Sequence, residues 1–276
     1  MSSSSSPAAT CAIDPVNARH FALPTLSLRF VHIWRRILLV WRKLAIPSML
    51  GNLADPMIFL FGLGYGLGAM MPAVQGVPYI AFLAGGMVVS STMYAATFEA
   101  LYSAFSRMHQ QKTWEGILNA PILLEDVILG ELVWATTKAT LSGVAILAVV
   151  TVLGFATPKF ALPLLFVIVL TGLAFAALGL AMNALAPNYD FFMYYFTLVI
   201  TPTSLISGVF FPIDQLPAAL HWAASILPLY HAVALARPLM LGEVPSNILL
   251  HLAVPLIYAC VGFYVALVLT RRRLLQ

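Results

Sequence analysis

The chain has 276 residues, of which 61% are hydrophobic and 9% are charged. This composition excludes a soluble domain, whose surface is normally rich in charged side chains, and it predicts an integral membrane protein. The formal net charge of +4 does not indicate nucleic-acid binding, because the basic residues gather beside apolar stretches and form no basic and aromatic stripe on a soluble module.

The chain begins with "MSSSSSPAAT", and residues 1–24 are predicted to be a flexible cytoplasmic leader. They are not expected to be a secretory signal, because no basic stretch is followed by an apolar core and a cleavage site. Cys11 and Cys260 lie in this leader and in the last apolar stretch, so no disulfide between them is expected.

Residues 25–46 predict an amphipathic helix in the membrane interface. Its basic side chains share one arc of the helix and its apolar and aromatic side chains share the opposite arc, which suits anionic headgroups on one side and acyl chains on the other. Pro47 is expected to end this helix. It serves either as a positive-inside anchor or as a rigid arm that joins cytoplasmic machinery to the first span.

Six later stretches are apolar enough to cross a bilayer. A span needs about 20 residues, because the hydrocarbon core is about 30 Å thick and a helix rises about 1.5 Å per residue. The predicted spans are about 48–70, 79–104, 127–152, 161–185, 191–211 and 247–270. We therefore expect an all-α polytopic membrane protein with one transmembrane domain over residues 47–273.

The basic residues predict the orientation. Eleven of the 14 Lys and Arg side chains lie before the first predicted span, between the second and third, or after the sixth, whereas only Lys159 and Arg237 lie on the other side. By the positive-inside rule both termini are cytoplasmic, which requires an even number of spans.

The first predicted span contains two features with alternative interpretations. The glycines of "GLGYGLG" at 62–68 lack the spacing of a dinucleotide site and favour close helix packing. Asp55 precedes Pro56, a pair typical of a helix N-terminus, so the span is expected to kink or restart there. A contact between Asp55 and a substrate is the alternative.

Charged residues also fall inside the second and third predicted spans. Glu131 and Lys138 are seven residues apart on nearly the same helix face, about 10 Å from each other along the axis, which is too far for a direct ion pair. Glu99 is therefore a candidate partner. Because charge inside a membrane is costly, these side chains indicate either a polar pathway or a structural contact between helices.

The link between these two spans, "SRMHQQKTWEGILNAPILLED", is the longest polar interruption of the membrane region. Residues 110–118 predict a short helix across the inner face, ended by Asn119 and Pro121. Such a helix could transmit force from a soluble partner or act as a tether.

The stretch 207–242 is apolar but interrupted by prolines at 212, 217, 228 and 238. Its apolar piece 216–227 is too short to cross, so a re-entrant hairpin over about 213–230 is expected before the last span. Backbone that breaks its helix at membrane depth must pack against protein or line a cavity, which predicts a vestibule or lid on the outer face.

Several kinds of chemistry find little support. No phosphate-binding loop is present, and His221, His231 and His251 are not at metal-ligand spacing, so no metal site is expected. Ser207 with His251 would make an intramembrane hydrolase on residue type alone. An ion-coupled secondary transporter using Lys138, Glu131 and Asp55 lacks the expected repeated halves.

The stretch 207–242 resembles the signature of the ABC-2 type permeases, with G-x-x-F-P, then L-P, then P-L-x-H-x-V-x-x-x-R. Together with "LADPMIFLFGLGYGLG" and "TWEGILNAPILLEDVILGELVWATTKA", the resemblance covers nearly all of residues 25–270. Within that family the stretches are most similar to the nodulation protein J group, the permeases of lipo-chitooligosaccharide exporters.

The resemblance implies a permease subunit in a bacterial inner membrane that moves a glycolipid or lipo-oligosaccharide out of the cytoplasm. A polysaccharide or a hydrophobic drug is the alternative cargo. Its implied partners are two copies of an ATP-binding subunit of the nodulation protein I type, a second copy of the permease, and membrane lipid. No cofactor would bind this chain, since ATP and Mg²⁺ would lie on the partner, and the chain itself would not be an enzyme.

Three groups of candidate site residues follow, of which the resemblance implies the first two and the charges inside the predicted spans imply the third. The coupling element comprises Lys112, Thr113, Trp114, Glu115 and Leu118. The outer gate comprises Phe210, Phe211, Pro212, Leu216, Pro217, Pro228 and His231. The candidate polar pathway comprises Asp55, Glu99, Glu131 and Lys138. The aromatic side chains among residues 191–196 indicate either an interfacial belt or a contact with cargo.

Overall fold

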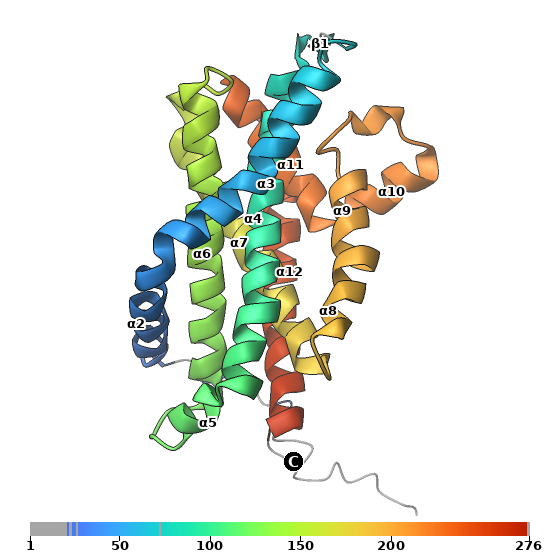
Figure 1. The fold of residues 1–276 in the computed structure, drawn as a ribbon. Helices are drawn as coiled ribbons and strands as arrows, with labels where there is room; N and C mark the ends of the chain where they lie inside the picture. Colours follow the sequence, from blue (N-terminus) through green and yellow to red (C-terminus); the bar gives the residue numbers. More distant parts are fainter. Residues whose placement is uncertain (1–20, 22–23, 26, 72, 275–276) are drawn as a thin grey trace, which may run out of the picture.

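The computed structural model describes residue 21 and residues 24–25, 27–71 and 73–274. These residues form a bundle of long helices that lie side by side (Figure 1). Nearly all of the predicted leader over 1–24 lies outside the described residues. The bundle has two ends, which we name the β1 end, after strand β1, and the α5 end, after helix α5; the last turn of α12 lies at the α5 end (Figure 1).

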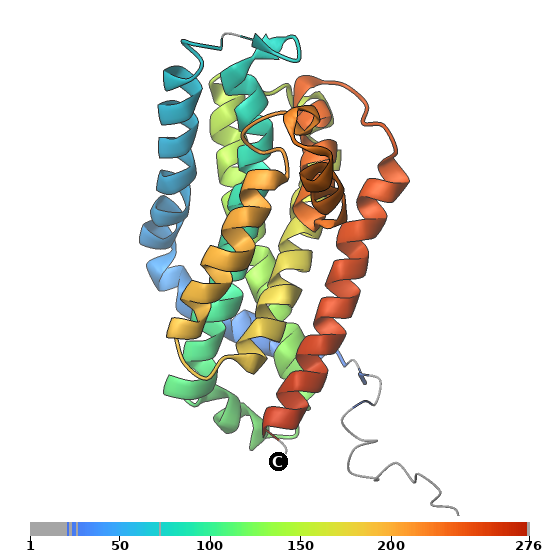
Figure 2. The same ribbon diagram turned by 90° about the vertical axis from the view of Figure 1, so that its right-hand side faces the viewer.

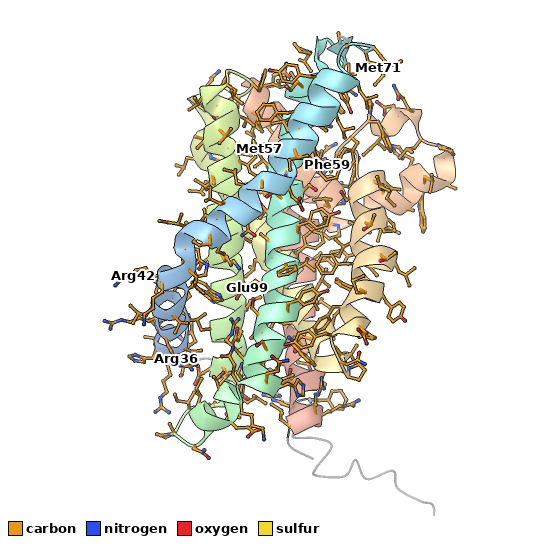
Figure 3. All side chains as sticks on the ribbon, viewed as in Figure 1. Arg36, Arg42, Met57, Phe59, Met71 and Glu99 are labelled. Atoms are coloured by element: carbon orange, nitrogen blue, oxygen red, sulfur yellow. The ribbon has the colours of Figure 1, made fainter. Side chains whose placement is uncertain are left out.

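The amphipathic helix is α2, Phe30–Trp41, and it packs on helix α6, Leu124–Val152, through the buried side chains Ile33 and Ile37. Figure 3 shows Arg36 and Arg42 pointing away from the bundle. The structure thus keeps the predicted apolar face but directs it toward protein.

The prediction that Pro47 ends the amphipathic helix is wrong. The break lies earlier, at the 3₁₀ turn Arg42–Leu44, and helix α3, Ala45–Gly66, then includes Pro47 in its first turn. A proline is tolerated there because the first backbone N–H groups of a helix have no partner within the helix.

A kink or a restart was expected at Asp55 and Pro56; helix α3 continues through Pro56, so no restart occurs there. The expected close packing of the glycines holds at Gly64, where an added β-carbon would lie 2.8 Å from Ile80 Cγ1. Gly62 and Gly66 face open space.

A short antiparallel hairpin of β1, Ala73–Val74, and β2, Val77–Pro78, joins α3 to α4, Tyr79–Phe98. The helix beginning with α4 continues through two π-helical segments, Glu99–Ser103 and Ser106–Gln110. It therefore runs six residues beyond the predicted end at 104. Helix α4 lies at the centre of the bundle, in contact with α3, α6, α7 and α11.

The next elements are α5, Thr113–Leu118, the long helix α6, a 3₁₀ turn at Pro158–Phe160, and α7, Ala161–Leu185. Glycines allow close contact among the central helices: a β-carbon on Gly143 of α6 would lie 2.7 Å from Ile168 of α7 and 2.3 Å from the hydroxyl of Thr92 in α4.

The predicted fifth span is shorter than expected. It consists of α8, Asp190–Tyr195, a π-helical segment Phe196–Ile200 and α9, Thr201–Ile206. It ends five residues before 211 because Gly208 takes a left-handed conformation with φ +78°, which directs the backbone out of the helix.

The predicted re-entrant segment is built from a 3₁₀ turn Ile213–Gln215, helix α10, Ala218–Ile226, and helix α11, Pro228–Leu241. The last two meet at an angle of 89°. Figures 1 and 2 show both near the β1 end, from which α12, Ile248–Leu274, then runs the length of the bundle. The segment therefore turns back without reaching the α5 end.

Among the described residues, five helical runs are long and apolar enough to cross a membrane, or six if α10 and α11 count as one broken span. Residues Asp190–Ile206 form a shorter apolar run. The predicted class, an all-α polytopic membrane protein, is confirmed.

Candidate functional site

Four charged side chains form a network between the π-helical extension of α4 and helix α6, in which both carboxylates are buried and both cations are partly buried. Arg107 donates from Nε to both carboxylate oxygens of Glu131, at 2.9 and 3.1 Å, and from a terminal nitrogen to Glu131, at 2.6 Å, and to Glu99, at 3.0 Å. Lys138 donates to the other oxygen of Glu99 at 2.8 Å. The two carboxylates and two cations balance in charge, which permits their burial.

Two tryptophans complete this network. The indole N–H of Trp134 in α6 donates to Glu99 at 2.7 Å, and that of Trp114 in α5 donates to Glu131 at 3.1 Å. Short helix α5 is thereby tied to the charges inside the bundle. A displacement of Trp114 away from Glu131 must stretch or break the hydrogen bond between them.

The structure brings together three of the four predicted pathway residues, and Glu99 is the partner of Lys138 as expected. Arg107 is not among the predicted site residues, because the sequence pattern assigns it to a cytoplasmic link. In an ideal α-helix residues 99 and 107 are about 80° apart around the axis, so helical periodicity gives no sign of the contact. The two π-helical segments change that phase and let both side chains meet.

The five residues expected to form the coupling element lie on or beside α5. Lys112 precedes the helix in a left-handed conformation with φ 48°, and it is exposed, as is Glu115. Trp114 is buried, whereas Thr113 and Leu118 are partly buried. Helix α5 thus has exposed side chains at Lys112 and Glu115, on its N-terminal side, and a buried indole that bonds to Glu131 inside the bundle.

The expected gate residues lie in and around the turn from α9 to α10, which we name the gate loop, residues 207–212. Val209 and Pro212 are buried, while Phe210 and Phe211 are partly buried. Leu216 and Pro217 lead into α10, and Pro228 is the first residue of α11.

His231 of α11 is buried against His251 of α12, with 2.8 Å between their Nδ1 atoms. The carbonyl of Ser225 accepts from Nε2 of His231 at 2.9 Å, so Nδ1 of a neutral His231 accepts from His251. The pair fastens α11 to α12. The side-chain hydroxyl of Ser207 has no hydrogen-bond partner in the described part of the chain, so the structure gives no support to a Ser207–His251 nucleophile.

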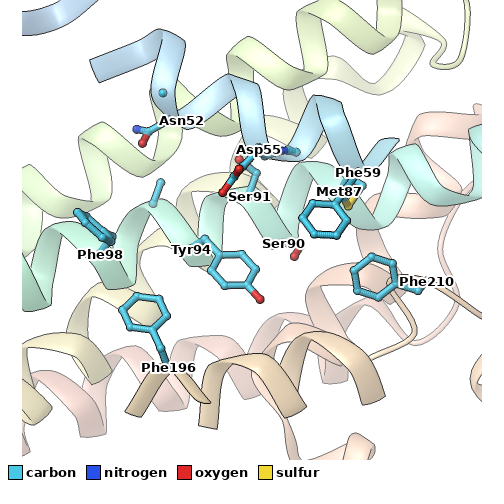
Figure 4. A pocket seen from close by; sticks show the side chains of 13 residues that line it. Asn52, Asp55, Phe59, Met87, Ser90, Ser91, Tyr94, Phe98, Phe196 and Phe210 are labelled. Carbon is cyan, nitrogen blue, oxygen red and sulfur yellow. The ribbon is translucent and has the colours of Figure 1, made fainter. Parts of the chain in front are cut away.

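A cleft of about 510 Å³ opens between α3, α4 and the run from α8 to α9. Figure 4 shows the rings of Tyr94, Phe98 and Phe196 between α4 and that run, and Asn52 and Asp55 on α3. Tyr94 stacks on Phe196 with ring centroids 6.5 Å apart. Ser90, Ser91 and Phe210 also line the cleft.

The cleft has both polar and apolar character. The side-chain nitrogen of Asn52 is buried and without a hydrogen-bond partner, and Asp55 has no ion pair among the described residues. Asp55 is thus placed with the cleft and not with the charge network. The cleft suits a ligand that carries hydroxyl or amide groups beside apolar surface.

The aromatic side chains of residues 191–196 divide between two roles. Phe192 is buried and packs edge-on against Phe105, with ring centroids 5.2 Å apart, whereas Phe196 lines the cleft. In the described part of the chain, no three His, Cys, Asp or Glu side chains gather as metal ligands would.

Comparison with known proteins matches residues 29–241 to the family model described as ABC-2 type transporter. The chain is 51% identical to nodulation protein J of Rhizobium leguminosarum bv. viciae over 254 residues, which are 92% of this chain and 98% of that protein. It is 49% identical to nodulation protein J of Rhizobium meliloti (strain 1021), over 92% and 97% of the two chains. It is also 24% identical to the inner membrane transport permease YadH of Escherichia coli (strain K12), over 80% and 83%.

Proposed function

The chain belongs to the ABC-2 type transporter family, and we propose that it is the permease of an exporter that moves a lipo-oligosaccharide out of the cytoplasm. The similarity to nodulation protein J over 92% of the chain supports this assignment. A glycolipid of this type has a sugar chain rich in hydroxyl and amide groups and an acyl chain. The permease would pass both parts through one membrane path.

The observation that carries the proposal is the two-sided lining of the cleft. Asn52, Asp55 and Ser90 offer an amide, a carboxylate and a hydroxyl that can bond to sugar groups. Tyr94 and Phe196 offer ring faces that can stack on a sugar or contact an acyl chain. The cleft is partly open. In this proposal a second copy of the permease closes it and contributes a second set of the same lining residues.

The orientation proposed is with the α5 end in the cytoplasm and the β1 end outside. It rests on the basic residues before α3, in the link that contains α5 and at the end of α12. Both chain ends are then cytoplasmic and the membrane is the bacterial inner membrane.

Power would come from two copies of a separate ATP-binding subunit of the nodulation protein I type, which would hold ATP and Mg²⁺. In this proposal that subunit presses on the exposed side chains of α5, Lys112 and Glu115. Trp114 carries the displacement to Glu131, and the charge network carries it to α4 and α6. Because α4 lines the cleft, the motion changes the cleft's width.

Reconstitution tests the cargo. The permease and its candidate ATP-binding subunit are purified together, placed in proteoliposomes, and assayed for ATP-dependent transport of a radiolabelled acylated chitin oligosaccharide. Unacylated polysaccharide and a hydrophobic dye are the competing cargoes. We expect transport of the acylated oligosaccharide, and transport of either competitor alone would overturn the proposed cargo.

A matched pair of variants tests the cleft. Phe196→Ala removes a ring from the cleft, whereas Leu198→Ala changes a neighbouring side chain of the same segment that is 71% exposed and does not line the cleft. We expect Phe196→Ala to lower transport at least several-fold and Leu198→Ala to leave it near the original rate. Equal effects of the two substitutions on the transport rate would show that the cargo does not pass through the cleft.

A further inference from the structure

Three successive carbonyl groups of the gate loop accept hydrogen bonds from side chains on other helices. A terminal nitrogen of Arg237 in α11 donates to Gly208 at 2.6 Å and to Val209 at 3.4 Å. The hydroxyl of Tyr79, the first residue of α4, donates to the carbonyl of Phe210 at 3.0 Å.

These hydrogen bonds satisfy backbone carbonyl groups that lie beyond the end of α9. The helix ends at Ile206, so the carbonyls of the next residues lack the helical N–H groups that would otherwise bond to them. Irregular backbone at membrane depth is stable only when protein or water satisfies it. Ser207, Gly208 and Val209 are buried, so protein side chains must serve here.

The surface of α4 is shaped for this contact. A β-carbon on Gly86 would lie 2.8 Å from the Cα of Val209, and one on Gly85 would lie 3.1 Å from the Cα of Arg237. Both glycines thus let the gate loop and the arginine approach the α4 backbone more closely than any other residue would permit.

Arg237 is held without a carboxylate. None of the ion pairs in the described part of the chain includes it. Its Nε donates to the carbonyl of Phe82 at 3.2 Å, and its guanidinium carbon lies 3.6 Å from the centre of the Phe82 ring. A cation paired only with carbonyl dipoles and a ring face can release them at less cost than it could leave a carboxylate.

We propose that Arg237 and Tyr79 are positioning residues of the outer gate, which hold the carbonyls of residues 208–210 and thereby keep the gate loop against α4. The gate opens when α11 moves away from α4 and the guanidinium leaves Gly208 and Val209. This inference rests on the proposed function, because it takes the gate loop as the barrier at the outer face.

The test measures how readily the gate loop opens. Ser207→Cys places a thiol at a position with 0% exposure, in the full chain with Cys11→Ser and Cys260→Ser. The protein is purified with its ATP-binding subunit and placed in nanodiscs, where a charged methanethiosulfonate reagent reaches both faces. The rate of thiol modification then reports how often the loop leaves α4, whatever the cargo or the orientation.

Two variants weaken the proposed bonds. Arg237→Lys keeps the charge but cannot reach the carbonyls of Phe82 and Gly208 together. Tyr79→Phe removes one hydroxyl and keeps the ring. We expect the modification rate to rise roughly fivefold in Tyr79→Phe and about tenfold or more in Arg237→Lys, since one hydrogen bond is worth about a factor of five in an equilibrium.

Arg273→Lys is the matched control. Arg273 also donates to two backbone carbonyls, those of Asn183 and Ala184, at 3.1 Å each, but it lies in the last turn of α12. We expect this variant, combined with Ser207→Cys, to leave the rate of thiol modification in the gate loop unchanged.

Unchanged modification rates in both gate variants would overturn the inference, and a rate that rises equally in Arg273→Lys would show general loosening instead. If Arg237→Lys does not assemble, Tyr79→Phe alone decides. Failure of the proposed function is recognised separately: the unaltered complex then transports no lipo-oligosaccharide, while the ratios of the modification rates stay as measured.

Discussion

At the scale of single residues, Glu99 is the centre of the charge network. It accepts from Arg107, Lys138 and Trp134, and its side chain is only 3% exposed. A buried ion pair contributes little net stability, but removing one partner leaves a buried charge and is strongly destabilising. The network therefore predicts a non-additive response to substitution.

We predict that Lys138→Met lowers the free energy of unfolding by about 1–3 kcal/mol, because Arg107 still faces Glu99 and limits the loss. Glu99→Gln is expected to cost a similar amount. The double variant should cost less than the sum, since it leaves the Arg107–Glu131 pair balanced. Unfolding in mixed micelles with increasing sodium dodecyl sulfate measures all three.

Lys159→Met is the control for that cycle, because Lys159 is exposed and lies in the link between α6 and α7. Its effect should stay within about 0.5 kcal/mol. Strict additivity of Glu99→Gln and Lys138→Met would contradict the network, since side chains in direct contact are expected to couple.

The pairing of Glu99 with Lys138 could be predicted from the sequence, because a charge inside a span needs a partner and few candidates exist. The role of Arg107 could not. The sequence pattern assigned it to a link, and the contact depends on two π-helical segments that no hydrophobic period marks. Arg237 likewise entered only the count of basic residues and the last position of the family signature, and its contacts could not be predicted, since its partners are backbone carbonyls, which leave no pattern in the sequence.

At the scale of helices, glycines set the spacing of the central layer. Gly143 of α6 faces Thr92 of α4 and Ile168 of α7, and its place for a β-carbon is already occupied. We predict that Gly143→Ala destabilises the protein by about 1–3 kcal/mol through overpacking. The shift of the thermal unfolding midpoint in detergent measures it.

Gly116→Ala in α5 is the matched control, because no atom lies within 4 Å of the position of its added β-carbon. Alanine there favours the helix by roughly 0.5–1 kcal/mol. We expect an unchanged or slightly raised unfolding midpoint. A loss of stability equal to that of Gly143→Ala would show that space around the residue does not decide the effect.

Trp114 joins helix α5 to the charge network. Trp114→Phe keeps an aromatic ring in the buried site but removes the N–H group that bonds to Glu131. We predict that transport per ATP hydrolysed falls roughly tenfold or more, since a hydrogen bond to a charged group contributes about 1.5–3 kcal/mol. Parallel assays of ATP hydrolysis and transport in proteoliposomes measure the ratio.

Trp222→Phe is the control for that variant, because Trp222 in α10 is 71% exposed and lies at the β1 end. Its ratio of transport to hydrolysis should match that of the original protein. An unchanged ratio of transport to hydrolysis in Trp114→Phe would show that the indole N–H group does not couple the two processes. Helix α5 would then act only as a tether.

The long helices were predictable to within a few residues, and the fourth span agrees at both ends, 161–185. Long apolar runs leave little choice when about 20 residues must cross a bilayer. The errors fall where proline or glycine acts through geometry: Pro47 is accommodated in a first turn, Pro56 stays inside α3, and Gly208 ends α9 early. The sequence pattern alone does not show whether such a proline or glycine ends a helix or is accommodated within it.

Across the whole bundle, the two ends contain different groups of candidate functional residues. The charge network, α5 and the basic end of α12 lie toward the α5 end, whereas the gate loop, to which Arg237 and Tyr79 donate hydrogen bonds, lies toward the β1 end. Helix α4 joins them, because Tyr79 contacts the gate loop at one end and Glu99 follows its last turn at the other. Movement of α4 would therefore act on both.

This arrangement predicts which residues share a side of the membrane. Asp214 precedes α10 and Glu243 follows α11, and both are exposed. Because the α10–α11 pair turns back, cysteines at both positions should react with a membrane-impermeant maleimide from the outer face of intact cells. Gln111→Cys, beside α5, should react only after the membrane is opened.

The same experiment separates a hairpin from a broken span. If α10 and α11 crossed the membrane together, Asp214→Cys and Glu243→Cys would be labelled from opposite faces, and α12 would have to run in the reverse direction. The structure instead starts α12 near the β1 end and finishes it beside α5 (Figure 2). Labelling of the two cysteines from opposite faces would refute the re-entrant hairpin, and with it the assignment of residues 207–212 as an outer gate.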